Sequence, residues 1–267
     1  MELRQRALEV LCLPDPADKA AEVSDLLHAA RDRRVMVDPC AVPLPQGPLP
    51  GRPARPRLVP PSQVPHRTPF TPQGRAALLH AIAHIEFNAI NLALDAVWRF
   101  AGMPTDFYFD WLQVAAEEAL HFTLLRDHLR QLNQDYGDFD AHDGLWAMTE
   151  KTQGDVIARM ALVPRTLEAR GLDATPPIQA KFAKAGDMRA VEILDVILRD
   201  EIGHVAIGNR WYAWLCGRHA LDPVSHYRVL VERYSAPRLK PPFNRPARLA
   251  AGFSEVELAY LTQSTDP

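Results

Sequence analysis

Two short stretches decide the fold: residues 114–125 read Val-Ala-Ala-Glu-Glu-Ala-Leu-His-Phe-Thr-Leu-Leu, and residues 197–205 read Ile-Leu-Arg-Asp-Glu-Ile-Gly-His-Val. Each contains a glutamate and a histidine three residues apart, Glu118 with His121 and Glu201 with His204. Residues at this spacing lie on the same face of an α-helix. Because apolar residues flank both pairs at helical spacing, we expect both faces to point into a helical core.

Outward from these motifs, apolar residues recur at helical spacing along most of the chain. Four long helices are predicted, over residues 72–101, 105–132, 145–170 and 175–216. The third has the poorest periodicity, with a predicted bend at Pro164 and an end at Gly171, and Pro176 and Pro177 are predicted to open the fourth. Alternating strand patterns are nearly absent. The sequence therefore predicts an all-α protein built on a four-helix bundle.

The remaining segments are predicted to decorate this bundle. The chain has 24 prolines, and 12 of them lie between Pro39 and Pro72, where they exclude regular helix or sheet. Asp15-Pro16 predicts a short helix before this segment, Asp222-Pro223 predicts one after the bundle, and Ser254 with Glu257 forms a capping box for a last helix. We expect an N-terminal helical and proline-rich wrap over residues 1–70, the bundle over 71–218 and a helical extension over 219–267.

Composition limits the class of protein. Of 267 residues, 47% are hydrophobic and 24% are charged, which excludes a disordered chain. The net charge of -3 gives no general attraction to nucleic acid. The three cysteines, Cys12, Cys40 and Cys216, fit neither a disulfide framework nor a cysteine metal cluster. With no signal peptide and no uncharged membrane span evident, we expect a cytoplasmic protein that does not bind a membrane.

Three glutamates lie inside apolar stripes: Glu118, Glu201 and Glu86, the last framed by Ile82 and Ile90. An ionised carboxylate buried without a partner costs several kcal/mol. Two divalent cations would balance four such acids, and the two histidines would complete the ligand set. We expect the fourth acid on the third helix, at Glu168 or alternatively at Glu150. Successive candidates are 32, 50 and 33 residues apart if Glu168 is chosen, as expected for one level of a four-helix bundle.

Other polar residues near this level have plainer interpretations. Glu117 and Asp200 adjoin ligand glutamates and could orient a ligand histidine through its second nitrogen. His80 and His84 are expected to be hydrogen-bonded at a helix interface rather than to bind metal. Arg165 and Arg170 could neutralise acids near the third helix, but we expect them to face solvent, as arginines near helix ends usually do. Tyr212 is expected to pack in the core rather than to donate a radical.

Five motifs are spread along the chain: Thr71-Pro72, His84-Ile85-Glu86, Glu117-Glu118-x-x-His121-Phe122, Pro164-Arg165-x-x-Glu168-Ala169-Arg170-Gly171-Leu172-Asp173 and Asp200-Glu201-x-Gly203-His204-Val205. In these motifs the chain resembles, over nearly its whole length, the ferritin-like family called domain of unknown function 455. More distantly the chain resembles the tRNA-modifying di-iron monooxygenases. The resemblance implies a ferritin-like bundle, a metal pair and Glu168 as a ligand, but no substrate.

These features favour an O₂-dependent oxidoreductase with two iron ions, two manganese ions or one of each, held by six residues: Glu86, Glu118, His121, Glu168, Glu201 and His204. A small molecule or a modified nucleotide would be the substrate, and a monooxygenase would need an electron donor. The basic segment 233–248 could hold tRNA, or could dock on the bundle with its arginines paired to acids, the reading we favour. Alternatives are ferritin-type metal storage and a non-catalytic scaffold; we expect a monomer or dimer.

Overall fold

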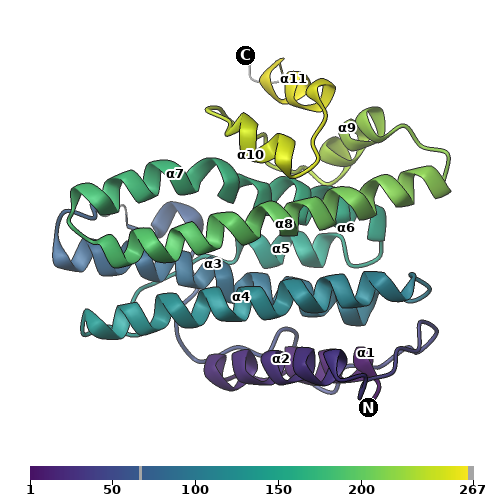
Figure 1. Ribbon diagram of the computed structural model, residues 1–267, viewed down its shortest axis with the longest axis horizontal. Coiled ribbons are helices and arrows are strands. Elements are labelled where there is room, and N and C mark those ends of the chain that lie inside the picture. The colour runs from purple at the N-terminus through teal and green to yellow at the C-terminus, as the bar shows by residue number, and fades with distance from the viewer. Residues whose placement is uncertain (66–67, 264–267) are drawn as a thin grey trace. The chain divides into compact units, whose positions relative to one another are not determined.

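The computed structural model describes residues 1–65 and 68–263 (Figure 1). In these residues the regular structure is helical, and β-type pairing is confined to isolated bridges from Glu2 to Met36 and from Leu58 to Ala141. The predicted all-α class is confirmed. The chain divides into two compact units, Met1–Trp146 and Ala147–Pro267, with the boundary inside α5 (Gly144–Lys151).

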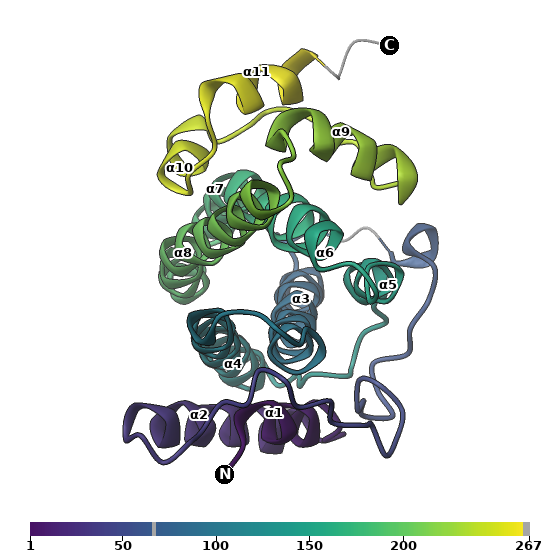
Figure 2. The ribbon, with the colours of Figure 1, turned by 90° about the vertical axis from the view of Figure 1, so that its right-hand side faces the viewer.

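Two long helices form the centre of the first unit. α3 covers Pro72–Arg99 and α4 covers Thr105–Gln131, close to the predicted limits, and the short connection between them makes the pair antiparallel. Thr71 caps α3, because its Oγ1 accepts a hydrogen bond from the Gly74 N–H at 3.1 Å. The N-terminal helix α1 (Leu3–Leu11) packs on α3, and α2 (Pro16–Arg31) packs on α4 (Figure 2).

The proline-rich segment follows the surface of this unit with one short 3₁₀ turn, η1 (Pro61–Gln63), in its described part. Lys19 anchors it from inside, since its fully buried Nζ donates to the carbonyl oxygens of Leu11 at 3.1 Å and Gly51 at 2.9 Å and to Asn91 Oδ1 at 2.6 Å. A buried ammonium needs such partners, because an unsolvated charge is costly. The segment is thereby fixed to α1, α2 and α3.

The prediction of one continuous third helix over residues 145–170 is wrong, and so is its predicted end at Gly171. After α5, the second unit continues with α6 (Val156–Leu162), then η2 (Val163–Glu168), which is a π-helix, and then α7 (Ala169–Lys184). Pro164 therefore lies in a π-helix rather than at a simple bend, and Gly171 lies within α7 rather than at a helix end.

The start of the fourth predicted helix is also wrong. Pro176 and Pro177 lie inside α7, and the long helix α8 covers Met188–Arg218. A proline inside a helix leaves the carbonyl four residues earlier without its N–H donor. For Pro176 that carbonyl belongs to Leu172, and Asn244 Nδ2 donates to it at 3.0 Å. The side chain of a distant residue thus replaces the missing backbone bond.

Three further helices complete the second unit: α9 (Pro223–Arg233), α10 (Arg245–Ala250) and α11 (Glu255–Gln263). The predicted capping box is present, since Ser254 N donates to Glu257 Oε2 at 2.7 Å and Glu257 N donates to Ser254 Oγ at 3.3 Å. In the basic segment 233–248, Arg245 pairs with Glu255 and Arg248 pairs with Asp173. Arg248 thus pairs with an acid of α7, as the docking interpretation expects, whereas Arg245 pairs with an acid of α11 in the C-terminal extension itself.

α3 is long and apolar enough to cross a membrane by length and composition, with a mean hydropathy of 1.3 in its most apolar window. However, 78% of that window is buried inside the protein. The central helix of a folded core passes the same test, so this composition does not by itself indicate a membrane span.

Candidate metal centre

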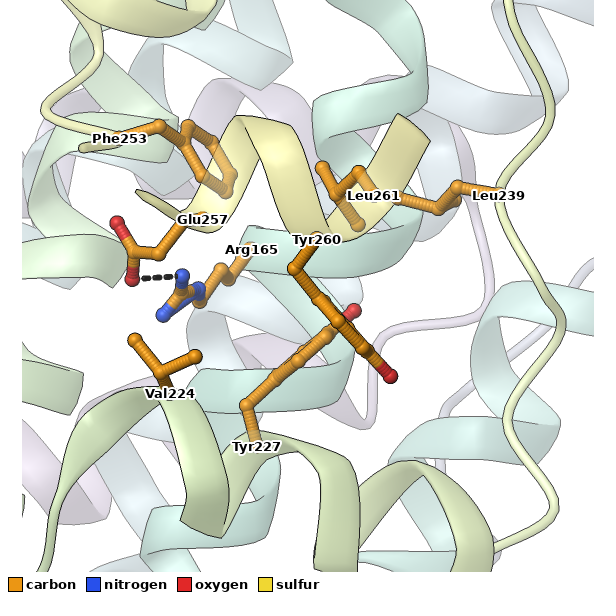
Figure 3. A pocket seen from close by; sticks show the side chains of 8 residues that line it. All are labelled: Arg165, Val224, Tyr227, Leu239, Phe253, Glu257, Tyr260 and Leu261. Carbon is orange, nitrogen blue, oxygen red and sulfur yellow. Dashed lines mark hydrogen bonds and ion pairs between the residues drawn. The ribbon is translucent and has the colours of Figure 1, made fainter. Parts of the chain in front are cut away.

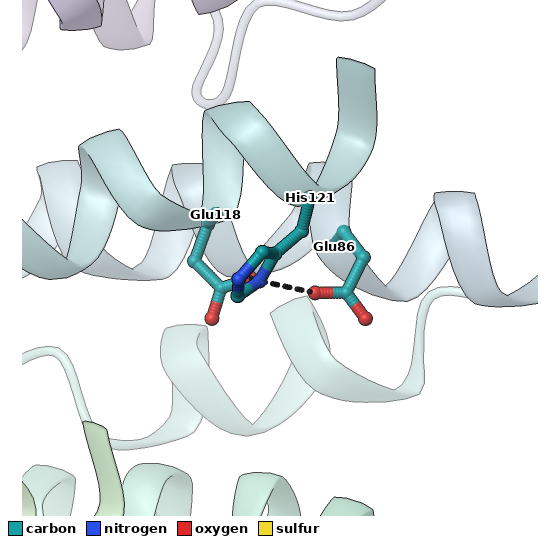
Figure 4. Close-up of side chains that lie close together, drawn as sticks. All are labelled: Glu86, Glu118 and His121. Atoms are coloured by element: carbon teal, nitrogen blue, oxygen red, sulfur yellow. Dashed lines mark hydrogen bonds and ion pairs between the residues drawn. The ribbon is translucent and has the colours of Figure 1, made fainter. Parts of the chain in front are cut away.

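Glu86, Glu118 and His121 converge inside the first unit. Glu86 extends from α3, while Glu118 and His121 share one face of α4, as their spacing predicts (Figure 4). His121 Nδ1 lies 3.3 Å from Glu86 Oε2 and 3.3 Å from Glu118 Oε2. One ligand atom from each of the three residues lies within 4.8 Å of the others. These distances allow a single ion to contact all three side chains.

This set lies in an apolar interior. The exposed fractions of the three side chains are 5% for Glu86 and 0% for Glu118 and His121. Burial raises the pKa of Glu86 well above its usual range, the negative charge of Glu118 raises it further, and His121 opposes the rise. Two buried carboxylates thus face each other at a position where added positive charge is favourable. A divalent cation fits this donor set, since carboxylate oxygen with imidazole nitrogen suits iron, manganese and zinc.

The neighbouring histidines of α3 are used in hydrogen bonds, as predicted. His84 Nδ1 lies 2.8 Å from the Tyr136 hydroxyl, and Asn88 Nδ2 lies 3.0 Å from His84 Nε2. His80 Nε2 accepts a hydrogen bond from Gly137 N at 2.9 Å. Burial lowers the pKa of His80 to about 4 and that of His84 to about 3, so both rings are neutral near pH 7.

The second unit holds the other three predicted ligands. Glu201 and His204 share one face of α8, with His204 Nδ1 3.9 Å from Glu201 Oε1. Glu168 is the last residue of the π-helix η2. All three are buried, with exposed fractions of 8% for Glu168, 7% for Glu201 and 0% for His204. A Cβ added at Gly171 would lie 3.9 Å from the carboxyl carbon of Glu201, so this carboxyl faces the first turn of α7, directly after Glu168.

The remaining candidates differ in their surroundings. Glu150, the alternative to Glu168, is exposed on α5. Glu117 accepts a hydrogen bond from Gln113 Nε2 at 2.7 Å, and Asp200 pairs with its neighbour Arg199 at 2.8 Å. The proposed roles of Glu117 and Asp200 toward the ligand histidines stay predictions.

Tyr212 is buried, and its hydroxyl donates to Pro223 O at 2.8 Å, in keeping with the packing role expected for it. Arg170 is exposed, but the solvent-facing role expected for Arg165 is wrong. The Arg165 side chain is 5% exposed and pairs with Glu257, because a carboxylate from α11 reaches it inside the protein.

Sequence reasoning missed the residues that support η2. The Tyr227 hydroxyl lies 2.9 Å from Thr166 Oγ1, and Gly208 lies against Pro164. The spacing of these residues carries no metal-ligand pattern. The weak periodicity of the third predicted helix was a usable signal, since a π-helix has a different period from an α-helix. Arg165 and Asp173 belong to one of the family motifs, but the sequence around them does not identify their partners in the C-terminal helices.

Fold and site together define an all-helical protein with buried glutamate and histidine groups that could hold metal. The chain belongs to the family described as "Protein of unknown function (DUF455)", which matches residues 12–259. It is 51% identical over 225 residues to an uncharacterized protein of Haemophilus influenzae, covering 82% of this chain and 78% of that protein. No solved structure matches the chain.

Proposed function

We propose that this protein holds two divalent metal ions and uses them in the O₂-dependent oxidation of an organic substrate. The observation that carries the proposal is the buried set of Glu86, Glu118 and His121, whose ligand atoms lie within 4.8 Å of one another. The proposed ligands are the six residues Glu86, Glu118, His121, Glu168, Glu201 and His204.

The composition of the two ligand sets supports a shared centre. Each unit contributes one glutamate from one helix and a Glu-x-x-His pair from another. Four carboxylates would balance the charge of two divalent ions, and two neutral histidines would complete the ligation. This is the set used by ferritin-like di-iron and di-manganese carboxylate proteins. The proposal therefore includes a ferritin-like four-helix bundle whose helices carry the two sets to one centre.

The protein's own groups would hold charge, orient ligands and exclude water. Val114 and Phe122 beside the α4 ligands, and Val205 beside His204, are at most 1% exposed, which keeps the ligands in an apolar environment. A low-dielectric environment strengthens the attraction between carboxylates and cations. A bound iron or manganese pair would supply the electrons that reduce O₂. A monooxygenase outcome would also need an electron donor.

Metal analysis tests this proposal directly. Protein purified without chelator and loaded with Fe²⁺ or Mn²⁺ is expected to hold two ions per chain. Glu118→Ala and Glu201→Ala are each expected to lose both, while Glu150→Ala, at an exposed position, should keep both. Equal sub-stoichiometric metal in all four proteins would favour the metal-free scaffold. Loss of one ion per variant, with the other retained, would indicate separate sites instead of a shared centre.

Two measurements distinguish the catalytic proposal from metal storage. Storage in the manner of ferritin predicts a large symmetric shell, whereas the oxidoreductase is proposed to be a cytoplasmic monomer or dimer. Size-exclusion mass separates these outcomes. Crystals of the loaded protein, with anomalous data at the iron and manganese edges, would identify the ions and their ligands.

The substrate is proposed to be a small organic molecule or a modified nucleotide. A tRNA substrate is a narrower form of the proposal, motivated by the basic residues of segment 233–248 that lie outside the Arg245 and Arg248 pairs, such as Arg238 and Lys240. Filter binding to total tRNA at two salt concentrations tests it, because phosphate contacts weaken as salt rises. Absence of salt-sensitive retention would exclude tRNA.

A further inference from the structure

The predicted ligand Glu168 ends a π-helix, which is a rare backbone geometry. Hydrogen bonds in a π-helix span five residues, and such turns persist where neighbouring groups hold them. Inside the turn, Thr166 Oγ1 donates to Ala161 O at 2.7 Å, five residues earlier. Thr166 is fully buried. The conformation of the residues just before Glu168 therefore depends on contacts made around Thr166.

One of these contacts comes from α9. The Tyr227 hydroxyl lies 2.9 Å from Thr166 Oγ1, and the Tyr227 side chain is buried with 6% exposure. Since the Thr166 hydroxyl donates to Ala161 O, it is left to accept the hydrogen bond from Tyr227. The pair forms a short buried chain from α9 through Thr166 to the backbone of α6.

A second contact comes from α11. Arg165, also in η2, forms an ion pair with Glu257, and the two side chains are 5% and 15% exposed (Figure 3). Three aromatic rings surround the guanidinium, with centroids 4.9 Å away for Tyr212 and 5.1 Å away for Tyr227 and Phe253. Burial opposes ionisation of Glu257, but the charge of Arg165 and the bonds from Arg165 and Ser254 keep its pKa below the usual range. This largely buried ion pair thus joins η2 to α11.

A third contact lies on the other side of Glu168. Arg248 of α10 is fully buried, and it donates to Asp173 Oδ2 at 2.7 Å, Asp173 Oδ1 at 3.0 Å and Ala169 O at 3.3 Å. Asp173 also accepts a hydrogen bond from Asn244 N at 2.8 Å. The C-terminal helices therefore hold the backbone both before and after Glu168.

We propose that α9, α10 and α11 form a brace that sets the position of Glu168 for metal binding, with Arg165, Thr166 and Asp173 as positioning residues. The inference rests on the proposed function, because it assigns the brace a role only if Glu168 binds metal. It goes beyond that function by making docking of the C-terminal helices and metal affinity mutually dependent. Linkage requires that each strengthen the other by the same factor.

The brace is tested with pairs of variants, each a test variant and its control, and with Co²⁺ as the probe. The stoichiometry, dissociation constant and visible spectrum of bound Co²⁺ are measured for each variant. Glu257→Gln removes the negative charge that pairs with Arg165, but glutamine is also suited to this position of the capping box. Its control is Glu255→Gln, also on α11, which removes an exposed ion pair with Arg245 of α10. Tyr227→Phe removes the bond to Thr166, and its control is Tyr234→Phe, which removes a bond to Asp155 from the residue that follows α9.

Glu257→Gln and Tyr227→Phe are expected to weaken Co²⁺ binding about tenfold and to change its absorption spectrum, as supporting contacts around metal ligands commonly do. The two controls should stay within about twofold of wild type. Wild-type affinity and spectrum in Glu257→Gln and Tyr227→Phe would overturn the brace alone. Absence of Co²⁺ binding by wild type would overturn the proposed function and the brace together.

Hydrogen exchange of the wild-type protein gives a second readout that needs no brace variant to fold. Addition of Co²⁺ is expected to slow exchange in α10 and α11, and Glu168→Gln should abolish this protection. Unchanged exchange in these helices on Co²⁺ binding would contradict the brace.

Discussion

Gly208 of α8 lies against Pro164 of η2 so closely that a Cβ added at Gly208 would be 2.7 Å from the Pro164 Cβ. Real side chains do not approach to this distance, and a proline ring on a packed helix has little freedom to yield. The glycine therefore lets the helix that carries Glu201 and His204 pack against the π-helix that carries Glu168.

Gly208→Ala is expected to lower the free energy of unfolding by about 1–3 kcal/mol, because the new methyl group overpacks this contact. Gly203→Ala on the same helix is the control, since nothing lies within 4 Å of its added Cβ. Alanine there should raise the free energy of unfolding by about 0.5–1 kcal/mol through helix propensity. Urea denaturation measures both, and equal stability of the two variants would contradict the packing argument.

Glu86→Gln should separate metal binding from folding. The amide has the shape of the carboxyl group without its charge, so the metal-free variant is expected to melt at a higher temperature than wild type. Changing a residue that only orients a metal ligand typically lowers metal affinity by roughly tenfold to hundredfold. Because Glu86 is proposed to bind the metal directly, its replacement should lower the affinity further. Asp127→Asn on α4, which removes an exposed pair with Arg130, is the matched control and should change neither quantity strongly. A variant that melts lower and binds metal normally would show that Glu86 has a structural role instead.

Because of Lys19, the free energy of unfolding is expected to rise with pH. Burial, aided by repulsion from Arg52, lowers its pKa to about 7 from an ordinary value of 10.5. Between these values the unfolded chain binds the proton and the folded chain releases it, so folding gains stability as pH rises. This contribution is complete above 10.5 and is lost as pH falls through about 7.

Chemical denaturation from pH 7.5 to 9.5 measures this slope, which has an upper limit of about 1.4 kcal/mol per pH unit for one proton. Lys19→Met should lose the slope, and it should also be less stable throughout, since buried oxygens bonded by Nζ lose their donor. Equal slopes in the two proteins would show that the buried amine keeps its proton.

Arg4 is expected to fix the start of the proline-rich segment. Its guanidinium, on a side chain with 1% exposure, donates to Pro39 O at 3.1 Å and to Trp98 O at 2.7 Å. Arg4→Met should lower the free energy of unfolding by about 2–4 kcal/mol, because buried carbonyls lose a charged donor. Limited proteolysis should cut near Pro39 sooner. Arg34→Met, which removes an exposed pair with Asp32, is the control and should behave as wild type.

Local signals in the sequence predicted the first unit well. Thr71 and Pro72 start α3, Thr105 starts α4, and the chain leaves each helix close to the expected position. The three-residue spacing of Glu118 and His121 places both on one helix face, and Glu86 meets them because α3 and α4 are joined by a short connection. Caps, prolines and periodicity act over a few residues, so they can be recognised without the rest of the chain.

The same rules failed between Pro164 and Pro177, where distant residues decide the backbone. Pro164 is accommodated against Gly208, and the carbonyl that Pro176 leaves without a donor is bonded by Asn244. Neither partner is identifiable from local spacing. The buried position of Arg165 likewise depends on Glu257, which lies 92 residues further along the chain.

By itself the sequence determined the all-helical class, the helices that carry every candidate ligand except Glu168, and the burial of those carboxylates, since apolar periodicity fixes which helix face turns inward. Tertiary structure alone decided that a π-helix precedes α7, and that Arg165 and Asp173 receive partners from the C-terminal helices. Those outcomes depend on contacts between residues far apart in the chain, whose energies local patterns do not encode.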